Sequence, residues 1–303
     1  MKKTSKIMSL VLAGAMVLSM TACAGNTAET TSAAAKTQET AADTASKAEE
    51  TTGAEASESE TAAKAEGTTY KIGVLQLVQH TALDAANDGF IAALDDAGIA
   101  YEVDQQNASG DQSACQTVAS KFANEKKDLI LAIATPAAQA MVGAVEDTPV
   151  LITAVTDPAE SGLVDTNEKP GANVTGTSDL TPVKEQIDLL KQLVPEAKTV
   201  GVLYCSAESN SKIQADMAKE AIAAAGMESK EYTVSSSNEI QTVVQSMVGA
   251  VDAVYAPTDN VIAAGMATVG MVAGDNNLPV ICGEAGMVQN GGLATYGIDY
   301  YQL

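Results

Sequence analysis

The sequence predicts an α/β fold with two doubly wound parallel-sheet lobes, a central cleft and a hinge. From Tyr70 onward, short apolar runs alternate with stretches of helical character. The runs are almost continuously apolar, which is typical of strands buried on both faces of a parallel sheet. The plan occurs twice, with TVGVLY at Thr199–Tyr204 echoing IGVLQL at Ile72–Leu77. Ligands bind beyond the carboxyl ends of such strands, so two facing sheets form a cleft that hinge motion can close.

The first half reads as four strands separated by three helices. Gly98 is expected to end the first helix, and Asp111 is expected to cap the second. The third strand stops at Thr135-Pro136, where Thr135 is expected to cap a helix with Pro136 at its first position. The expected strands are Lys71–Val78, Ile99–Gln105, Asp128–Ala134 and Pro149–Ala154, and the helices are Thr81–Ala97, Asp111–Asn124 and Pro136–Val145.

The second half repeats this plan after a connecting segment, Thr156–Val183, and the halves are expected to join again near the C-terminus. Pro279 follows the last helix as Pro149 does in the first half. The expected strands are Thr199–Tyr204, Glu231–Val234, Asp252–Ala256 and Leu278–Ile281, and the helices are Asn210–Ala225, Glu239–Val248 and Val261–Ala273.

The N-terminus has the pattern of an export signal followed by a linker. Residues 1–22 begin with lysines and continue with a short apolar stretch and small residues. Met20-Thr21-Ala22-Cys23 resembles a bacterial lipobox, which implies cleavage before Cys23 and its lipidation; a plain signal with a fortuitous Cys is the alternative. Residues 23–69 lack large apolar side chains and are expected to be a disordered linker. The N-terminal lobe is then 70–182, with hinge segment 156–182, and the C-terminal lobe is 183–303.

Charge and cysteine usage exclude several kinds of partner. The net charge of −22 argues against nucleic acid. The chain contains no Arg, which excludes an arginine–carboxylate clamp. Cys115, Cys205 and Cys282 lack metal-type spacing and are expected to be small buried apolar residues, although a disulfide between two of them is left open. No cofactor or metal is expected.

Several segments together resemble one transporter family across residues 70–303. They are VLQLVQHTALDAANDGF (74–90), LAIATPAAQA (131–140), ITAVTDP (152–158), GVLYCSAESNS (201–211), YAPTDN (255–260) and GGLATYGIDYYQL (291–303). They look like the ABC-transporter substrate-binding lipoproteins that include tryptophan- and tyrosine-binding proteins. The resemblance implies a type I periplasmic-binding fold, no catalysis, and delivery of an amino-acid-like, aromatic ligand to a permease with a cytoplasmic ATPase. Family members normally continue past YYQL, so we expect the final segments to be truncated at Leu303.

Neutral donors are expected to bind the carboxylate of such a ligand. Thr135 and the N–H groups of Ala137 and Ala138 lie at one expected helix start, and Ser206 and Asn210 lie at another. Helix N-termini and hydroxyl groups suit a desolvated anion. Simple helix capping by Ser206 and Asn210 is the alternative.

Acidic residues at expected strand ends are candidates for the ligand's ammonium group. Asp157 in AVTDP and Asp259 in PTDN lead, and Glu284 in CGEAG is third. Asp259 could instead cap the following helix, and Asp157 could only shape the turn before Pro158. The other candidates are the neighbouring residues Thr156, Thr258 and Asn260, and Gln76 and His80 after the first strand.

Other functions remain open or are disfavoured. The same lobes could serve a ligand-sensing receptor that signals to a membrane partner, and the solute could be a nucleoside or a branched amino acid. Few aromatic residues could stack on an indole, and these are Tyr204, Tyr255, Tyr296 and Phe90. An enzyme is disfavoured because the chain lacks G-x-S-x-G, G-x-G-x-x-G, a Walker loop and zinc spacing. We expect a monomer held at the outer face of the bacterial cell membrane by its lipid anchor.

Overall fold

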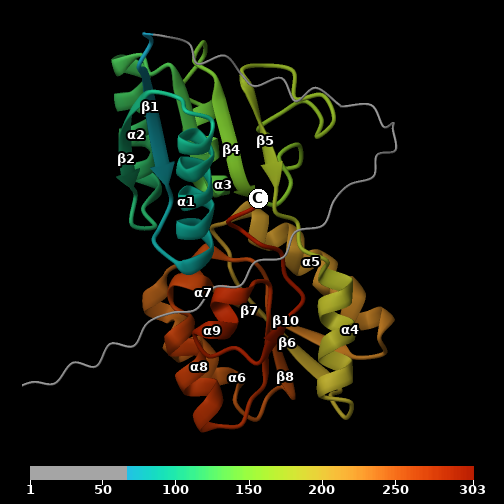
Figure 1. Ribbon diagram of the computed structural model, residues 1–303. Coiled ribbons are helices and arrows are strands. Elements are labelled where there is room, and N and C mark those ends of the chain that lie inside the picture. The colour runs from blue at the N-terminus through green and yellow to red at the C-terminus, as the bar shows by residue number, and fades with distance from the viewer. Residues whose placement is uncertain (1–66) are drawn as a thin grey trace, which may run out of the picture. The chain divides into compact units, whose positions relative to one another are not determined.

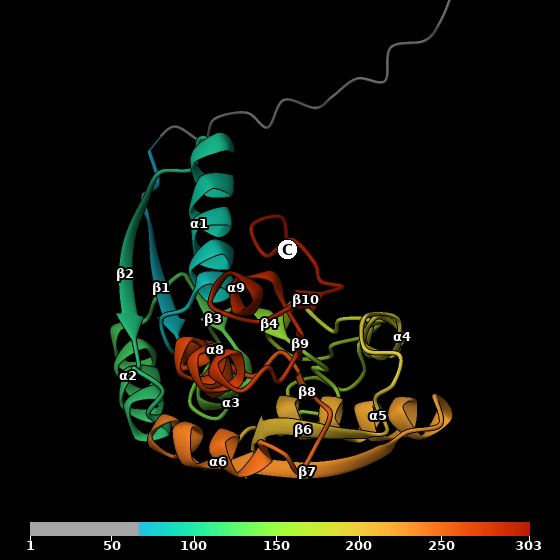
Figure 2. The same cartoon turned by 90° about the horizontal axis from the view of Figure 1, so that it is seen from below.

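The computed structural model describes residues 67–303. The expected signal peptide (1–22), the lipidation site Cys23 and nearly all of the expected linker (23–69) lie outside the described residues. The described chain forms two five-stranded sheets with helices packed around them (Figures 1 and 2).

The first sheet is wholly parallel, with strand order β2-β1-β3-β4-β5. Asp128 ties its first and third strands, because its carboxylate accepts the backbone N–H of Lys71 at 2.7 Å. The strands are β1 (Tyr70–Gln76), β2 (Tyr101–Asn107), β3 (Leu129–Ile133), β4 (Val150–Val155) and β5 (Val174–Ser178).

The second sheet has the same strand order as the first. This is seen when β6 is counted as its first strand and the sheet is read from β7 to β10. Its order is β10-β9-β8-β6-β7, and every pairing is parallel. Asp252 has the same role here as Asp128 in the first sheet: its carboxylate accepts the N–H groups of Lys198 and Thr199 at 2.8 and 2.9 Å. The predicted internal repeat is therefore confirmed. The strands are β6 (Thr199–Cys205), β7 (Glu228–Val234), β8 (Ala253–Ala256), β9 (Val280–Cys282) and β10 (Ala294–Thr295).

Nine α-helices connect the strands within residues 67–303. Asp111 caps α2, accepting the N–H groups of Ser113 and Ala114, as the sequence predicts. The helices are α1 (Thr81–Asp96), α2 (Gln112–Glu125), α3 (Thr135–Val142), α4 (Val183–Leu193), α5 (Ser209–Ala224), α6 (Ile240–Met247), α7 (Asn260–Ala264), α8 (Met266–Asp275) and α9 (Ala285–Gln289).

Strand burial explains the continuous apolar runs. Along β6, Leu203 and Cys205 pack into the core on one face of the sheet, while Val202 and Tyr204 pack into the core on the other. Successive side chains point to opposite faces, so a strand covered on both sides is apolar at nearly every position. The three cysteines of the described chain, Cys115, Cys205 and Cys282, are buried and free, as expected.

Two helix predictions are wrong. Thr135 is the first residue of α3 rather than its cap; Ala134 precedes the helix, and the Thr135 hydroxyl has no hydrogen-bond partner. The single helix expected over Val261–Ala273 is divided at Gly265 into α7 and α8. A β-carbon at Gly265 would press against Cδ1 of Ile240 on α6, so a larger residue at the break requires that buried side chain to move.

The chain crosses between the sheets twice. The first crossing runs from the end of β5 into α4, through Asp179. The second follows β10, after which Tyr300 packs into the hydrophobic core of the first sheet. The Tyr300 hydroxyl donates to Asp179 at 2.8 Å, so one hydrogen bond joins the two crossings across 121 positions of sequence.

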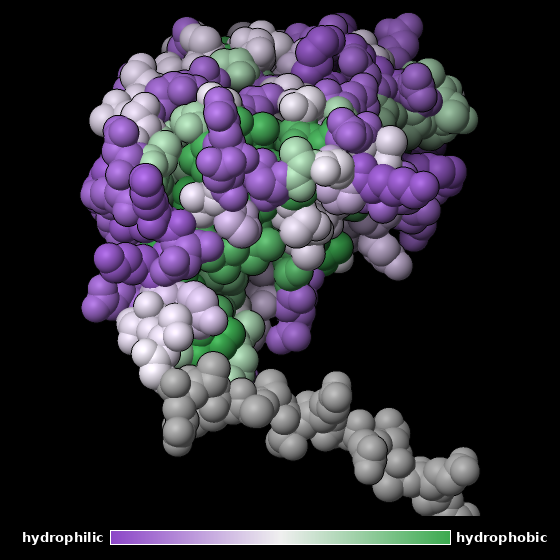
Figure 3. Space-filling model, turned by 90° about the horizontal axis from the view of Figure 1, so that it is seen from above, coloured by the Kyte–Doolittle hydropathy of each residue, from purple (hydrophilic) through white to green (hydrophobic). Residues whose placement is uncertain are grey.

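An open groove of about 560 Å³ lies over the first sheet, between α1 and the last residues of the chain. Its lining includes Phe90, Leu151 and Leu303. Figure 3 shows hydrophobic side chains gathered between hydrophilic ones on the face seen from above. Among the described residues, no helix is both long enough and apolar enough to cross a membrane.

Candidate ligand-binding site

A small buried cavity lies where the two sheets face each other. It collects residues that follow β4, β5, β8 and β9, as expected for the carboxyl ends of parallel strands. Its free volume is about 10 Å³, enough for one water-sized group but not for an amino-acid side chain. The lining residues are His80, Leu83, Ala154, Thr156, Asp179, Asn210, Thr258, Asp259, Asn260, Ala263, Glu284 and Tyr300.

The structure brings together seven of the thirteen ligand-binding residues predicted from the sequence. Those in the cavity lining are His80, Thr156, Asn210, Thr258, Asp259, Asn260 and Glu284. The other six are Gln76, Thr135, Ala137, Ala138, Asp157 and Ser206, and none of them lines the cavity.

The residues expected to donate hydrogen bonds to an anion are bonded within the protein or buried. The N–H of Ala138 donates within the helix to the carbonyl of Ala134 at 3.0 Å, and Ala137 is fully buried. The hydroxyl of Ser206 donates to the carbonyl of Val234 at 3.3 Å. These donors do not converge on one anion site in the described conformation.

Gln76 and Asp157 also make local contacts. The amide of Gln76 donates to Asp84 at 2.7 Å, within the first lobe. Asp157 accepts the N–H of Glu160 and the side-chain amide of Asn167, both at 3.0 Å. These bonds organise the turn around Pro158, in agreement with the alternative interpretation of Asp157.

Asp259 and Glu284 line the cavity, but their carboxylates cap helices. Asp259 accepts the N–H of Cys205 at 2.5 Å and that of Ile262 at 2.8 Å, so each of its oxygens already accepts one backbone donor. Glu284 caps α9 through the N–H groups of Gly286 and Met287. Burial raises the pKa of both carboxyl groups, although these backbone donors oppose the shift.

Sequence reasoning missed Asp179, the buried acid at the end of β5. Its Oδ2 accepts the Tyr300 hydroxyl, while its Oδ1 has no hydrogen-bond partner. Burial raises the pKa of Asp179 to about 6, against the lowering effects of the Tyr300 hydroxyl, of its own backbone N–H and of the nearby Thr156 hydroxyl. The sequence offered no apolar run to mark it, because Asp179 follows β5, in which only Val174 is buried.

Glu208, which was also missed, organises the side of the cavity formed by the second sheet. It is 4% exposed, and its Oε2 accepts the side-chain amides of Asn260 at 2.8 Å and Asn210 at 3.3 Å. Burial, followed by the nearby charge of Asp259, raises the pKa of Glu208 to about 7. The ion pairs of residues 67–303 include none to Asp179, Glu208, Asp259 or Glu284.

The aromatic residues predicted as stacking partners do not line the cavity. Tyr255 is fully buried and donates to Gln186, Tyr204 donates to Glu231, and Tyr296 is 59% exposed. Phe90 lines the groove over the first sheet instead. Tyr300 is the aromatic residue that reaches the cavity.

Hydrogen bonds between the two sides close the cleft. The amide of Gln214 on α5 donates to Thr156 at 3.1 Å, and His80 Nε2 lies 3.3 Å from Asn260 Oδ1. At the periphery, Gln139 donates to Ser209 at 3.4 Å. A ligand larger than one water-sized group requires these contacts to separate.

Comparison with known proteins identifies the family. The model of the family described as ABC transporter substrate binding protein matches residues 71–303. A tyrosine-binding protein of Clostridioides difficile (strain R20291) is 42% identical over 309 residues, covering 100% of this chain and 82% of its own length. No groups of three or more His, Cys, Asp or Glu in the described part of the chain could hold a metal ion.

Two solved structures differ in how closely they match. An ABC domain from Streptococcus pneumonia in complex with L-Trp is 40% identical, with TM-score 0.75, covering 77% of this chain and 80% of its own. A ligand-free, open substrate-binding protein with adhesive properties from Clostridium difficile is 47% identical, with TM-score 0.57, covering 77% and 81%. More distant solved structures share the type I periplasmic-binding architecture. This chain therefore belongs to the family of ABC-transporter substrate-binding proteins.

Proposed function

We propose that this protein is the extracytoplasmic receptor of an ABC importer and captures an aromatic amino acid between its two lobes. Closure of the lobes, 70–182 and 183–303, encloses the ligand, and the closed form delivers it to a permease driven by a cytoplasmic ATPase. The receptor works as a non-catalytic monomer, tethered to the bacterial cell membrane by a lipid on Cys23 after removal of residues 1–22.

The observation that carries this proposal is a buried, acceptor-rich cavity between the lobes with no lysine paired to its carboxylates. Asp179 is 5% exposed and keeps one carboxylate oxygen without a partner. Buried charge is costly without a partner, so such a site suits a ligand that brings its own cation. An α-ammonium group meets this requirement.

The comparisons support an aromatic side chain. The relatives named for their ligands bind tyrosine or L-tryptophan, and they are 42% and 40% identical to this chain. This chain also has the higher TM-score with the L-Trp complex, 0.75 against 0.57, although the open ligand-free structure is more similar in sequence. The described conformation is thus more similar to the complex with L-Trp than to the ligand-free, open structure.

A thermal-shift screen of the purified protein against the twenty amino acids and common nucleosides tests the proposal. A ligand at 100 times its dissociation constant stabilises the folded state by about 2.7 kcal/mol. We expect tyrosine, tryptophan or phenylalanine to raise the melting temperature. A shift produced only by a nucleoside or a branched amino acid would reject the aromatic assignment, and isothermal titration calorimetry then gives the affinity of any ligand found.

A further inference from the structure

Three residues that line the interlobe cavity each have a buried polar atom without a hydrogen-bond partner. Asp179 Oδ1, Asn210 Oδ1 and His80 Nδ1 are buried atoms without a hydrogen-bond partner, and all three residues line the cavity. Buried polar atoms are nearly always hydrogen-bonded, so three exceptions in one place require an explanation. They come from the start of α1, the end of β5 and the start of α5, and therefore from both sides of the cleft.

Asp179 is held with one oxygen directed away from its protein partner. Its N–H donates to the carbonyl of Val155 at 3.1 Å, which fixes the backbone beside β4. The Tyr300 hydroxyl occupies Oδ2 at 2.8 Å and leaves Oδ1 without a partner. A carboxylate has several lone-pair sites, so this oxygen can accept from a further donor.

The orientation of Asn210 follows from its surroundings. Its Nδ2 lies 3.3 Å from Glu208 Oε2 and 3.4 Å from the carbonyl oxygen of Thr258, and both of these atoms are acceptors. Reversing the amide would bring Oδ1 against these oxygens, so Nδ2 must face them. Asn210 Oδ1 is thereby fixed as the acceptor without a partner.

The same glutamate fixes the tautomer of His80 through one intermediate residue. Asn260 Nδ2 donates to Glu208 Oε2 at 2.8 Å, so Asn260 Oδ1 is the atom that faces His80 Nε2 at 3.3 Å. Nε2 must carry the hydrogen for this contact, which leaves Nδ1 with a lone pair. Burial lowers the pKa of His80, against the effects of Asn260 and Asp84, and this favours the neutral ring.

We propose that Asp179, Asn210 and His80 form the binding site for the primary ammonium group of the ligand, with Glu208 as the residue that positions two of them. A primary ammonium has three N–H donors and one positive charge, which match three acceptors and one ionised carboxylate. The site rests on the proposed function and specifies which part of an amino acid is recognised here. It assigns the counter-ion role to Asp179, in place of Asp157 or Asp259.

The closed cavity holds the acceptors around one water-sized space. About 10 Å³ matches an ammonium headgroup alone, so the rest of an amino acid enters only when the contacts between the lobes move apart. Asn210 belongs to the second lobe and His80 to the first, so all three acceptors surround one group only when the cleft is closed. Recognition of the ammonium group therefore favours closure.

Paired ligands separate recognition of the ammonium from recognition of the rest of the molecule. L-Tyrosine and L-tryptophan are compared by calorimetry with 3-(4-hydroxyphenyl)propionate and indole-3-propionate, which lack the amino group. Wild-type protein is expected to bind the amino acids at least about tenfold more tightly than these analogues, since hydrogen bonds to charged groups are strong. Asp179→Asn is expected to lose at least about tenfold in affinity for the amino acids, and less than about threefold for the analogues.

The controls distinguish failure of this site from failure of the proposed function. Asp188→Asn removes an exposed carboxylate on α4 and should leave both affinities unchanged. If wild-type protein binds no aromatic amino acid, the proposed function fails. If wild-type protein binds one and Asp179→Asn keeps the same affinity and the same preference over the analogue, the ammonium site is wrong while the proposed function stands. Thermal unfolding without ligand checks that the variant is folded.

Because His80 is the single histidine of the chain, its ¹⁵N-labelled imidazole gives an unambiguous NMR signal. We expect a neutral ring protonated at Nε2 at pH 7, with the Nδ1 resonance shifting when the amino acid is added but not when its analogue is added. Glu208→Gln should mix the tautomers and reduce the preference for the amino acid, because an amide can donate to Asn260. A free protein protonated at Nδ1, or an unchanged Nδ1 resonance on amino-acid binding, would overturn the assignment.

Discussion

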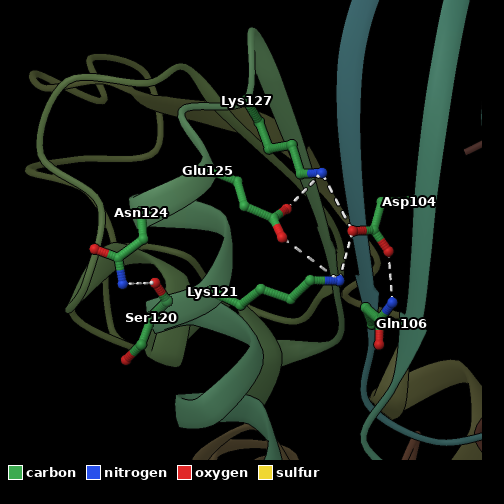
Figure 4. Close-up of polar contacts among 7 residues, drawn as sticks. All are labelled: Asp104, Gln106, Ser120, Lys121, Asn124, Glu125 and Lys127. Atoms are coloured by element: carbon green, nitrogen blue, oxygen red, sulfur yellow. Dashed lines mark hydrogen bonds and ion pairs between the residues drawn. The ribbon is translucent and has the colours of Figure 1, made fainter.

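Asp104 illustrates a charged group whose role is structural. On β2, its Oδ2 accepts from Lys121 at 2.6 Å and from Lys127 at 3.2 Å, while Gln106 donates to Oδ1 (Figure 4). Both ammonium groups also lie over the ring of Phe122, at 5.5 and 5.0 Å from its centroid. Burial opposes ionisation of Asp104, but the hydrogen bonds from Lys121, Gln106 and Lys127 lower its pKa to about 2.

Asp104→Asn should therefore destabilise the protein in a pH-dependent way. A carboxyl group whose pKa is depressed on folding stabilises the folded state above its unfolded pKa of 3.8, and this contribution is lost as the pH falls through about 2. We expect a loss of at most about 2 kcal/mol at pH 7, reduced by salt because Lys121 is partly exposed. Urea unfolding at pH 7 and near pH 2 measures the difference.

The exposed pair Lys184–Asp188 on α4 is the control for Asp104. Its atoms are 2.6 Å apart, but its side chains are 72% and 49% exposed, so solvent screens the pair. Asp188→Asn should not change the free energy of unfolding measurably at either pH. An equal effect of Asp104→Asn at both pH values would contradict the electrostatic explanation.

Gly73 and Gly201 occupy the same position in the two repeats but have different neighbours. A methyl group at Gly73 would lie 2.7 Å from Cδ2 of the fully buried Phe122 ring, whereas at Gly201 it would meet the flexible Met247 methyl. Gly73→Ala should cost about 1–3 kcal/mol and Gly201→Ala clearly less, because methionine can adopt another rotamer. Chemical denaturation of both variants tests this order, which equal losses would refute.

At the scale of elements, the apolar runs predicted the strands that are buried on both faces. β5 was missed because only Val174 of its five residues is buried, so VTGTS carries no apolar signal. β10 has only two residues, both partly buried, and was not predicted either. These strands lie at the edges of their sheets, where strand formation depends on pairing with a neighbour already in place rather than on local sequence.

The candidate site was predictable where it depends on strand ends and not where it depends on distant pairing. Thr156, Thr258 and Glu284 follow strands that the sequence reveals, and all three line the cavity. Asp179 and Tyr300 meet only because two crossings of the chain come together across 121 positions. The spacing of residues along the sequence gives no indication of that contact.

The turn between β3 and α3 contains backbone strain that local substitution can measure. Ala134 has φ 83° and ψ 151°, a region that glycine tolerates and alanine rarely adopts. Ala132, two residues earlier on β3, is equally buried but has no positive φ. We expect Ala134→Gly to be less destabilising than Ala132→Gly by about 1–2 kcal/mol, since both lose one buried methyl and only the first relieves strain.

Equilibrium unfolding of the two alanine variants gives this difference directly. The comparison also removes the entropy that a glycine adds to the unfolded chain, because both variants contain one new glycine. If the two losses are equal, Ala134 is not strained in solution.

At the scale of the whole molecule, the acids between the lobes connect ligand binding with pH. Asp179 must be ionised to balance an ammonium group, and burial raises its pKa in the free protein to about 6. Five other titratable groups line or adjoin the cavity. The pKa of Glu208 is raised to about 7, and burial raises the pKa values of Asp259, Glu284 and Tyr300. Burial lowers the pKa of His80. Lowering the pH therefore adds protons to a site that needs negative charge.

We expect the affinity for an aromatic amino acid to fall as the pH decreases below about 6, approaching tenfold per pH unit for each proton that must be released on binding. The analogue without an amino group should show the opposite sign or no change, since protonation of Asp179 removes a charge that repels its carboxylate. Calorimetric titrations from pH 8 to pH 5 measure both trends. Asp179→Asn should make the affinity for the amino acid less dependent on pH in the range where Asp179 titrates. The pH dependence that comes from Glu208 should remain. A parallel loss for both ligands would instead indicate that acid opens or unfolds the lobes without any specific role of Asp179.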